Sequence, residues 1–128
     1  MIQTKPEGTL SLQTVPFPAD TNGNGDIFGG WVLSQMDVAA GITAIERAKG
    51  RCSTVAIEAM RFHAPVLVGD VFSVYTSIVG TGVTSVTIHV EAWVKRQKDG
   101  NLEMVTEGDF TFVAIESSGV KRPLPPAA

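Results

Sequence analysis

Cysteine is almost missing from this chain, and charged residues are sparse. Among 128 residues there is a single cysteine, Cys52, so no disulfide can form within the chain. This suits a reducing compartment, because disulfides occur mainly in secreted and extracellular proteins. Only 18% of the residues are charged, the net charge is −3, and the basic residues are scattered along the sequence. A broad basic surface for nucleic acid is therefore not expected.

Long apolar runs are also absent. No uninterrupted hydrophobic stretch reaches the roughly 20 residues that are needed to cross a bilayer. Residues 1–7 lack the charged-then-apolar plan of a signal peptide. We therefore expect no membrane partner and a cytoplasmic location.

Common catalytic and metal-binding motifs are missing as well. The two histidines, His63 and His89, are far apart in the sequence, and no group of histidines, cysteines and carboxylates has metal-site spacing, so no metal is expected. The Gly-x-Ser-x-Gly elbow of serine hydrolases is absent. Cys52 has no nucleophile setting, which favours a core thiol.

One loop resembles a calcium site only at its beginning. Residues 20–25 match the opening of an EF-hand loop, but Trp31 stands where its twelfth residue should be glutamate, and no helix is expected before the loop. No Gly-Lys-Ser/Thr follows the loop, so a phosphate-binding P-loop is excluded too. We reject calcium and expect a structured turn-rich loop.

The patterns that are present predict one strand, one long helix and four further strands. The helix is rich in Ala, Leu, Ile and Met, and Gly50 is its expected C-cap. In the segment 85–96, apolar and polar residues alternate as in a half-buried strand, with Trp93 as the apolar exception on the polar side. The expected bounds are 9–15 for the first strand, 30–49 for the helix, and 53–61, 71–79, 85–96 and 103–115 for the other strands.

This order predicts a single α+β domain over 1–128, in which one long helix packs on a five-stranded antiparallel sheet. The proline-rich tail over 117–128 is expected to be loosely held. The sheet face away from the helix carries a polar set with one large aromatic ring. Either solvent or another subunit covers that set, which comprises His89, Glu91, Trp93, Glu107 and Asp109.

Asp37 is the clearest chemical anomaly of the helix. Its neighbours on the same helical face include Leu33, Ala40 and Ala44, and none of its neighbours there is a cation. Burying an unpaired carboxylate costs several kcal/mol unless something compensates. Asp37 is therefore either an ordinary exposed side chain or a candidate general base.

Gly29 and Gly30 stand at the start of the helix. Amide groups of a first helical turn point outward, and the helix dipole there favours negative charge. Glycine also lets a ligand approach the backbone closely. The pair is either a tight turn that needs glycine or a site for a developing oxyanion.

Residues 22–30 fit the pattern Asn-x-x-Gly-x-x-aromatic-Gly-Gly, six residues follow, and then comes Asp37. With this motif the chain resembles the hot-dog-fold acyl-CoA thioesterases, and among them the YciA type. The resemblance covers nearly the whole chain. Its main segments are 19–37, 58–62, 68–70, 84–88, 91–95 and 121–125.

The resemblance implies a catalytic role for three residues. Asp37 lies at the position of the family's general base or nucleophile. The Gly29–Gly30 turn matches the family's oxyanion site, with the Gly30 amide as the expected donor. Asn22 matches an asparagine that positions water or the carbonyl group and reaches the site from the facing subunit. Phe28 stands where the wider family has histidine, as it does in the YciA subgroup.

The resemblance also implies the ligand and the assembly. The substrate would be an acyl-CoA, and coenzyme A would be part of substrate and product, with no other cofactor. Two subunits would join their sheets and form active sites at the interface, and three such dimers would form a hexamer. Coenzyme A contacts are expected from Gly29, Arg61, Gly82, Thr84 and Ser85, and Lys95 and Arg122 are further candidates for its phosphates.

Two other functions remain open on this sequence. Hot-dog dehydratases act on β-hydroxyacyl thioesters with a histidine and an acidic residue, but Phe28 stands at the relevant turn. The other function is that of a non-catalytic acyl-CoA sensor or carrier. Asp37 argues against it, because a carrier needs no carboxylate near a thioester.

Overall fold

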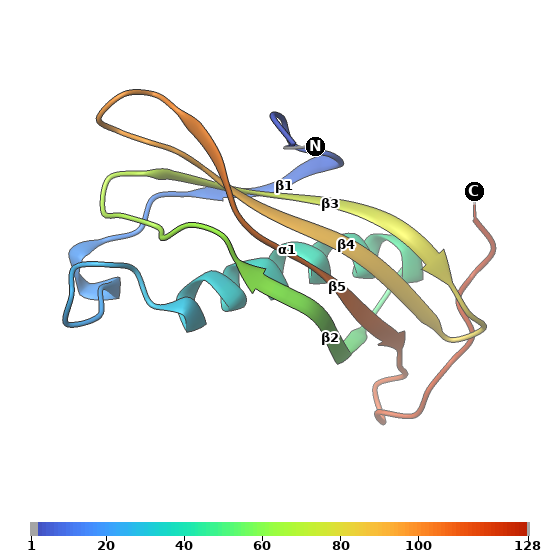
Figure 1. Cartoon of the computed structure of the whole chain (residues 1–128). Helices are drawn as coiled ribbons and strands as arrows, with labels where there is room; N and C mark the ends of the chain where they lie inside the picture. Colours follow the sequence, from blue (N-terminus) through green and yellow to red (C-terminus); the bar gives the residue numbers. More distant parts are fainter. Residues whose placement is uncertain (1–2, 128) are drawn as a thin grey trace.

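The computed structural model describes residues 3–127 and contains one long helix with a five-stranded sheet (Figure 1). The predicted order of elements is confirmed, and most bounds agree within one or two residues. The elements are β1 (Thr9–Thr14), the short 3-10 helix η1 (Pro18–Asp20), α1 (Gly29–Ala48), β2 (Cys52–Phe62), β3 (Val71–Thr81), β4 (Ser85–Lys95) and β5 (Leu102–Ala114).

The sheet has the strand order β1-β3-β4-β5-β2, and every neighbouring pair is antiparallel. The strands curve around α1, which lies along one face (Figure 1). This confirms the predicted α+β class with a helix wrapped by an antiparallel sheet. Within residues 3–127, strand β2 pairs only with β5, so its other edge is an edge of the sheet.

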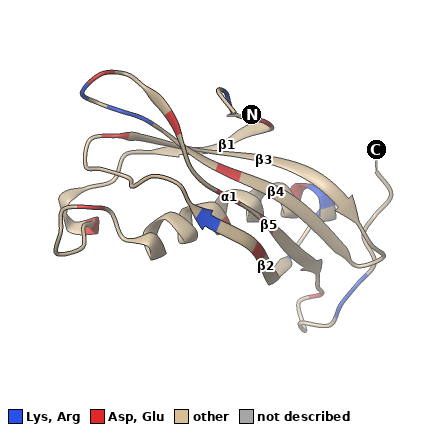
Figure 2. Cartoon of the chain, viewed as in Figure 1, with Lys and Arg blue, Asp and Glu red and all other residues tan. Residues whose placement is uncertain are grey.

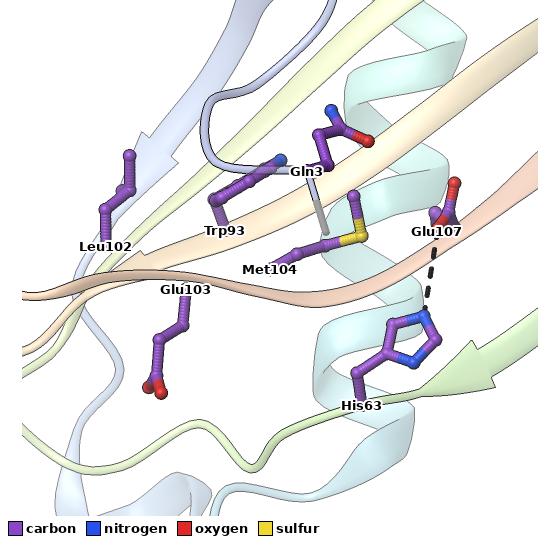
Figure 3. Close-up of a pocket in the computed structure, with 7 residues that line it drawn as sticks. All are labelled: Gln3, His63, Trp93, Leu102, Glu103, Met104 and Glu107. Atoms are coloured by element: carbon purple, nitrogen blue, oxygen red, sulfur yellow. Dashed lines mark ion pairs between the residues drawn. The ribbon is translucent and has the colours of Figure 1, made fainter. Parts of the chain in front are cut away.

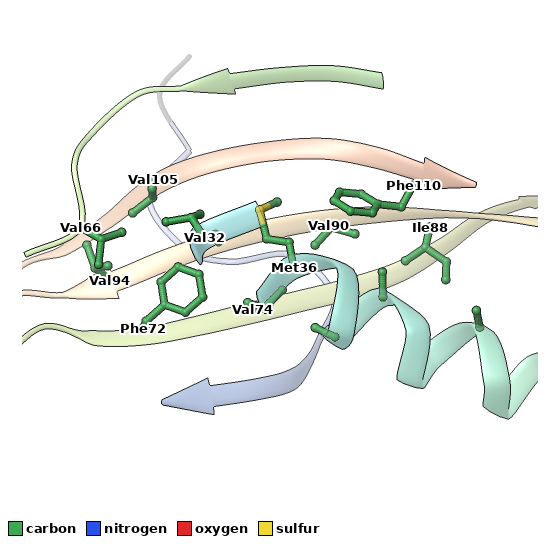
Figure 4. Packing of buried hydrophobic residues seen from close by; sticks show 14 of the residues in the cluster. Val32, Met36, Val66, Phe72, Val74, Ile88, Val90, Val94, Val105 and Phe110 are labelled. Atoms are coloured by element: carbon green, nitrogen blue, oxygen red, sulfur yellow. The ribbon is translucent and has the colours of Figure 1, made fainter. Parts of the chain in front are cut away.

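The core lies between α1 and the sheet (Figure 4). The alternation in β4 predicts which side chains face the helix, and those five are fully buried: Val86, Ile88, Val90, Ala92 and Val94. From α1, Val32 and Met36 pack against them, and small alanines at 39, 40 and 44 allow the helix to lie close to the sheet. This packing holds α1 in a fixed position against the sheet.

The end of α1 differs from the prediction. The residue in the left-handed conformation is Lys49, with φ of 53°, and not Gly50. Gly50 is needed for a different reason, because a Cβ there would lie 2.7 Å from the guanidinium of Arg122. That guanidinium donates a hydrogen bond to the carbonyl of Ala48 at 3.0 Å. Gly50 therefore lets Arg122 satisfy a helix-end carbonyl.

We expect the Lys49→Gly change to stabilise the protein. The left-handed conformation costs a non-glycine residue roughly 1–2 kcal/mol, and glycine does not have this cost. Urea denaturation should therefore show a free energy of unfolding about 1 kcal/mol higher than that of the wild type. Glu46→Gly, in the same helix, should lower it by about 1 kcal/mol. An unchanged or lower stability of Lys49→Gly would contradict this account of the helix end.

Parts of the tail contact the rest of the chain. Lys121 forms a β-bridge with Ile115, and the amide of Leu124 donates to the carbonyl of Val83 at 2.8 Å. The Leu124 side chain packs against the core. The expectation of a loosely held tail stays a prediction, although these contacts tie residues 121 and 124 to the rest of the chain.

The face of the sheet away from α1 is partly covered by the chain itself. Trp93 and Glu91 are each 1% exposed. The side-chain amide of Gln3 donates to Glu91 at 2.8 Å, and so does the backbone amide of Glu7 at 3.1 Å. Neither solvent nor a second subunit therefore has to cover the Trp93 side chain, because the N-terminal segment covers this part of the sheet face.

Charged residues are dispersed along the ribbon and form no basic stripe (Figure 2). Within residues 3–127, no helix combines the length and the apolar character that a membrane crossing requires.

Candidate active site

The loop before α1 is a closed and ordered structure. Thr21 and Ile27 form a β-bridge across it, and the amide of Phe28 donates to the carbonyl of Asp20 at 3.0 Å. The side-chain oxygen of Asn22 accepts the amide of Asn24 at 2.8 Å. These bonds confirm the structured turn that the sequence predicts, and they fix the position at which α1 begins.

The first turn of α1 offers backbone donors. Phe28 is the N-cap and gives the helix no side-chain cap, and its carbonyl accepts the amides of Trp31 and Val32. In the described part of the chain, no acceptor is hydrogen-bonded to the amides of Gly29 and Gly30. Both glycines are exposed, and a Cβ at Gly30 would have open space around it. These groups can bind an anionic oxygen at the positive end of the helix dipole.

Asp37 is half-buried and has one partner from another element. Its Oδ1 accepts a hydrogen bond from the Thr54 hydroxyl of β2 at 2.8 Å. The helix itself supplies no cation to Asp37, as predicted, but β2 orients the carboxylate. Thr54 is a residue that sequence reasoning missed, because nothing in the pattern of β2 shows which helix residue it will contact.

A cavity of about 380 Å³ lies beside the start of α1. Asn22 and Gly29 both line it, so the structure brings these two predicted site residues together. The rest of the wall combines apolar side chains, among them Val32, Phe62 and Val66, with the polar side chains of Asp26 and His63. A hollow of mixed polarity beside free amide donors can hold a carbonyl compound.

Gly30 and Asp37 cannot act on the same carbonyl group within one chain. They are seven residues apart, which places them on the same helical face but separates them by about 10 Å along the axis. A reacting carbon needs the oxyanion donor and the activated nucleophile each within about 3 Å. One chain therefore carries the two halves of a site at separate places.

Comparison with known proteins identifies the family. The sequence model of the thioesterase superfamily matches residues 24–100. The chain is 49% identical over 123 residues to the acyl-CoA thioester hydrolase YciA of Escherichia coli, and the match covers 94% of this chain and 93% of that one. The chain belongs to the thioesterase superfamily.

Solved structures of this superfamily have the same fold. A hexameric thioesterase from Yersinia pestis is 48% identical, with a TM-score of 0.92 over 96% of this chain and all of the other. A hexameric broad specificity acyl-coenzyme A thioesterase, solved as an aspartate-to-alanine mutant, is 46% identical, with a TM-score of 0.90 over 93% of this chain and 88% of the other. The predicted hot-dog fold and the YciA-type resemblance are thereby confirmed.

The residues predicted to contact coenzyme A do not form one group in the thioesterase chain. Gly82 and Ser85 form the turn into β4, where the Gly82 amide donates to the Ser85 carbonyl at 2.9 Å, and Thr84 lies between them. Ser85 pairs with Val113 near the end of β5. Arg61 is exposed and pairs with Glu107 in the middle of the same strand. A single chain thus separates these candidates along the sheet.

Cys52 is a packed thiol in this thioesterase. It is partly buried against the core and lies 3.6 Å from the carbonyl oxygen of Ala44. Burial raises the pKa of the Cys52 thiol above its ordinary value, although the nearby charge of Arg122 opposes this shift. A raised pKa disfavours the reactive thiolate, as the prediction of a core thiol requires.

Proposed function

We propose that this chain hydrolyses acyl-CoA thioesters to a carboxylic acid and coenzyme A. One observation carries the proposal: free amides at the start of α1 and the oriented carboxylate of Asp37 lie on the same helical face. The relative from Escherichia coli, of nearly equal length, is named an acyl-CoA thioester hydrolase, which supports the same reaction here.

The active site would be assembled from two copies of the chain. The free edge of β2 is available for pairing, and Thr54, the partner of Asp37, lies on that strand. Around this edge Val38, Val55 and Ile57 are exposed by 54%, 55% and 39%. Pairing of the β2 edges of two copies would remove the unpaired backbone N–H and C=O groups and this apolar surface from water. Asp37 of one copy could then face the amide of Gly30 of the other.

Three such dimers would form the complete assembly. Two related structures, from Yersinia pestis and of the broad specificity enzyme, are described as hexameric. We infer the same trimer of dimers here, with sheets joined through β2. Light scattering of the purified protein measures this state directly.

The chemistry follows from the two halves of the site. The thioester carbonyl oxygen accepts the Gly30 amide, and a donor of this type lowers the barrier by roughly 2.7–4 kcal/mol. Asp37 either removes a proton from the attacking water or attacks the carbonyl carbon itself. In the second route, water then hydrolyses the acyl-Asp37 anhydride, restores the carboxylate and supplies the proton. The carbon–sulfur bond breaks, and coenzyme A leaves with the proton as a thiol. Asn22 positions the water or the carbonyl.

The remaining predicted residues would hold the coenzyme A part of the substrate. In this proposal Gly29, Thr84 and Ser85 contact the pantetheine arm or nucleotide, Gly82 shapes the turn, and Arg61 meets a phosphate. The two copies bring these positions together although one chain separates them. Each step uses groups of the chain and water, so the reaction needs no further cofactor.

Release of free thiol from a series of acyl-CoAs, short to long, tests the proposed function. We expect wild-type protein to release coenzyme A and an equal amount of free acid, and the series gives the preferred chain length. Hydration or dehydration of the acyl chain without thiol release would indicate a dehydratase. Binding without any turnover would indicate a sensor or carrier. Either of these two results would contradict the proposal.

A further inference from the structure

The sheet face away from α1 carries a compact group of metal-ligating side chains on β4 and β5. The Nε2 atom of His89 lies 3.0 Å from Glu91 Oε2 and 3.5 Å from Glu107 Oε1. One ligand atom from each of the three residues lies within 4.8 Å of the others. A tetrahedral zinc ion with bonds of about 2.0–2.2 Å separates its ligand atoms by roughly 3.4 Å, which the two measured distances bracket.

Other groups of the chain hold these side chains in place. Asp109 Oδ1 lies 2.9 Å from His89 Nδ1, so the Nδ1–H can donate to the carboxylate while Nε2 stays directed at the two glutamates. In metal sites the second ring N–H of a histidine ligand is donated to a carboxylate, a backbone carbonyl or water, which orients the ring. The arrangement of His89 is thus compatible with a metal bound at Nε2.

Glu91 is fixed in the same way. Its Oε1 accepts three N–H groups, from Trp93 at 2.9 Å, from Gln3 at 2.8 Å and from the backbone of Glu7 at 3.1 Å. These donors leave Oε2 directed at His89, and the Glu91 side chain is 1% exposed. A carboxylate with one oxygen saturated by donors and the other turned toward an imidazole is a preorganised monodentate ligand.

The group carries an excess of negative charge. Three carboxylates, of Glu91, Glu107 and Asp109, surround one imidazole. Arg61 lines the same hollow, but among residues 3–127 no lysine or arginine forms a salt bridge with these carboxylates. On the open side, His63 Nε2 lies 3.7 Å from Glu107 Oε2 (Figure 3). A divalent cation would offset this charge and could take His63 or water as its fourth ligand.

We propose that His89, Glu91 and Glu107 form a zinc site on the outer face of the sheet, completed by His63 or a water molecule. The mixed nitrogen and oxygen ligand set suits Zn²⁺ better than Ca²⁺ or Mg²⁺, which prefer oxygen alone. The ion would tie β4 and β5 to the N-terminal segment through Glu91. Its three protein ligands lie on the sheet face away from α1, whereas His63 also lines the cavity beside the start of that helix. The proposed site would revise the expectation, from the sequence, that the chain binds no metal.

Zinc titration of the chelator-treated, full-length protein in its native assembly tests the site. Burial lowers the pKa of His89, but hydrogen bonds with Asp109 and Glu91 outweigh it and raise the pKa above its ordinary value. A proton on His89 therefore competes with Zn²⁺ for the ring nitrogen. For this reason the calorimetric titration is made at mildly alkaline pH. We expect one Zn²⁺ per chain and a higher melting temperature with zinc than without it.

Three variants assign the ligands. Glu107→Gln and His89→Gln should abolish stoichiometric binding, and Asp109→Asn should weaken it by about 10–100-fold. The Glu107 side chain is partly exposed, so Glu107→Gln tests zinc binding at this site even if His89→Gln fails to fold. Glu116→Gln, at an exposed loop, serves as the matched control and should bind like wild type. No saturable binding, or equal affinity in wild type and Glu107→Gln, would overturn the proposal.

Discussion

The Asp37→Asn variant is expected to lose nearly all acyl-CoA hydrolysis while it keeps its fold. General-base catalysis typically contributes about 10²–10⁴ to the rate, and kcat should fall by that amount. The amide oxygen of asparagine can still accept the hydrogen bond that Thr54 donates to Asp37 Oδ1 at 2.8 Å. The packing of α1 therefore stays intact, and the loss of activity measures only the contribution of the negative charge of Asp37.

Steady-state thiol release gives kcat and KM for this variant, and circular dichroism with thermal melting checks its fold. Glu46→Gln is the matched control, because Glu46 is an exposed carboxylate of the same helix. We expect its kcat to equal that of the wild type. If Asp37→Asn and Asp37→Ala both kept wild-type turnover, the carboxylate would have no role in the reaction.

The Gly30→Pro variant should have the second largest effect. Proline removes the backbone N–H but is tolerated in the first turn of a helix, where that group has no intrahelical partner. The preceding residue, Gly29, has no Cβ to clash with the proline ring, and open space surrounds the Cβ position at residue 30. Loss of one oxyanion donor typically lowers kcat by about 10²–10³.

Gly30→Ala is the comparison for this change, because alanine keeps the amide and also adds a Cβ. We expect the alanine variant to retain clearly more activity than the proline variant, with the difference in kcat rather than in KM. Equal activity of the proline variant and the wild type would show that the Gly30 amide does not stabilise the oxyanion.

Much of the fold could be predicted because hydrophobic periodicity is a local property of the sequence. The alternation over 85–96 identifies the face of β4 that packs on α1, and the proline-free apolar segment identifies the helix. The site motif is local as well, since the turn at 22–30 and Asp37 are close in the sequence. For these reasons the elements and the two halves of the candidate site were accessible without coordinates.

Contacts between distant segments were not accessible in this way. The left-handed residue at the end of α1 is Lys49, and Gly50 leaves room for the distant Arg122 side chain. The N-terminal segment covers Trp93, although their separation in sequence gives no sign of it. Likewise, His89 and Glu107 lack metal-ligand spacing along the chain, and only the register of β4 with β5 places them together.

Mixed assemblies of two inactive variants test the central claim, which is that two copies share each site. Asp37→Asn and Gly30→Pro chains with different tags are coexpressed, assemblies that contain both are purified, and thiol release from acyl-CoA is measured. In a symmetric dimer, one site then carries both defects and the other carries neither, so about half of the wild-type activity per heterodimer should return. Mixed assemblies as inactive as the two parent variants would contradict a shared site.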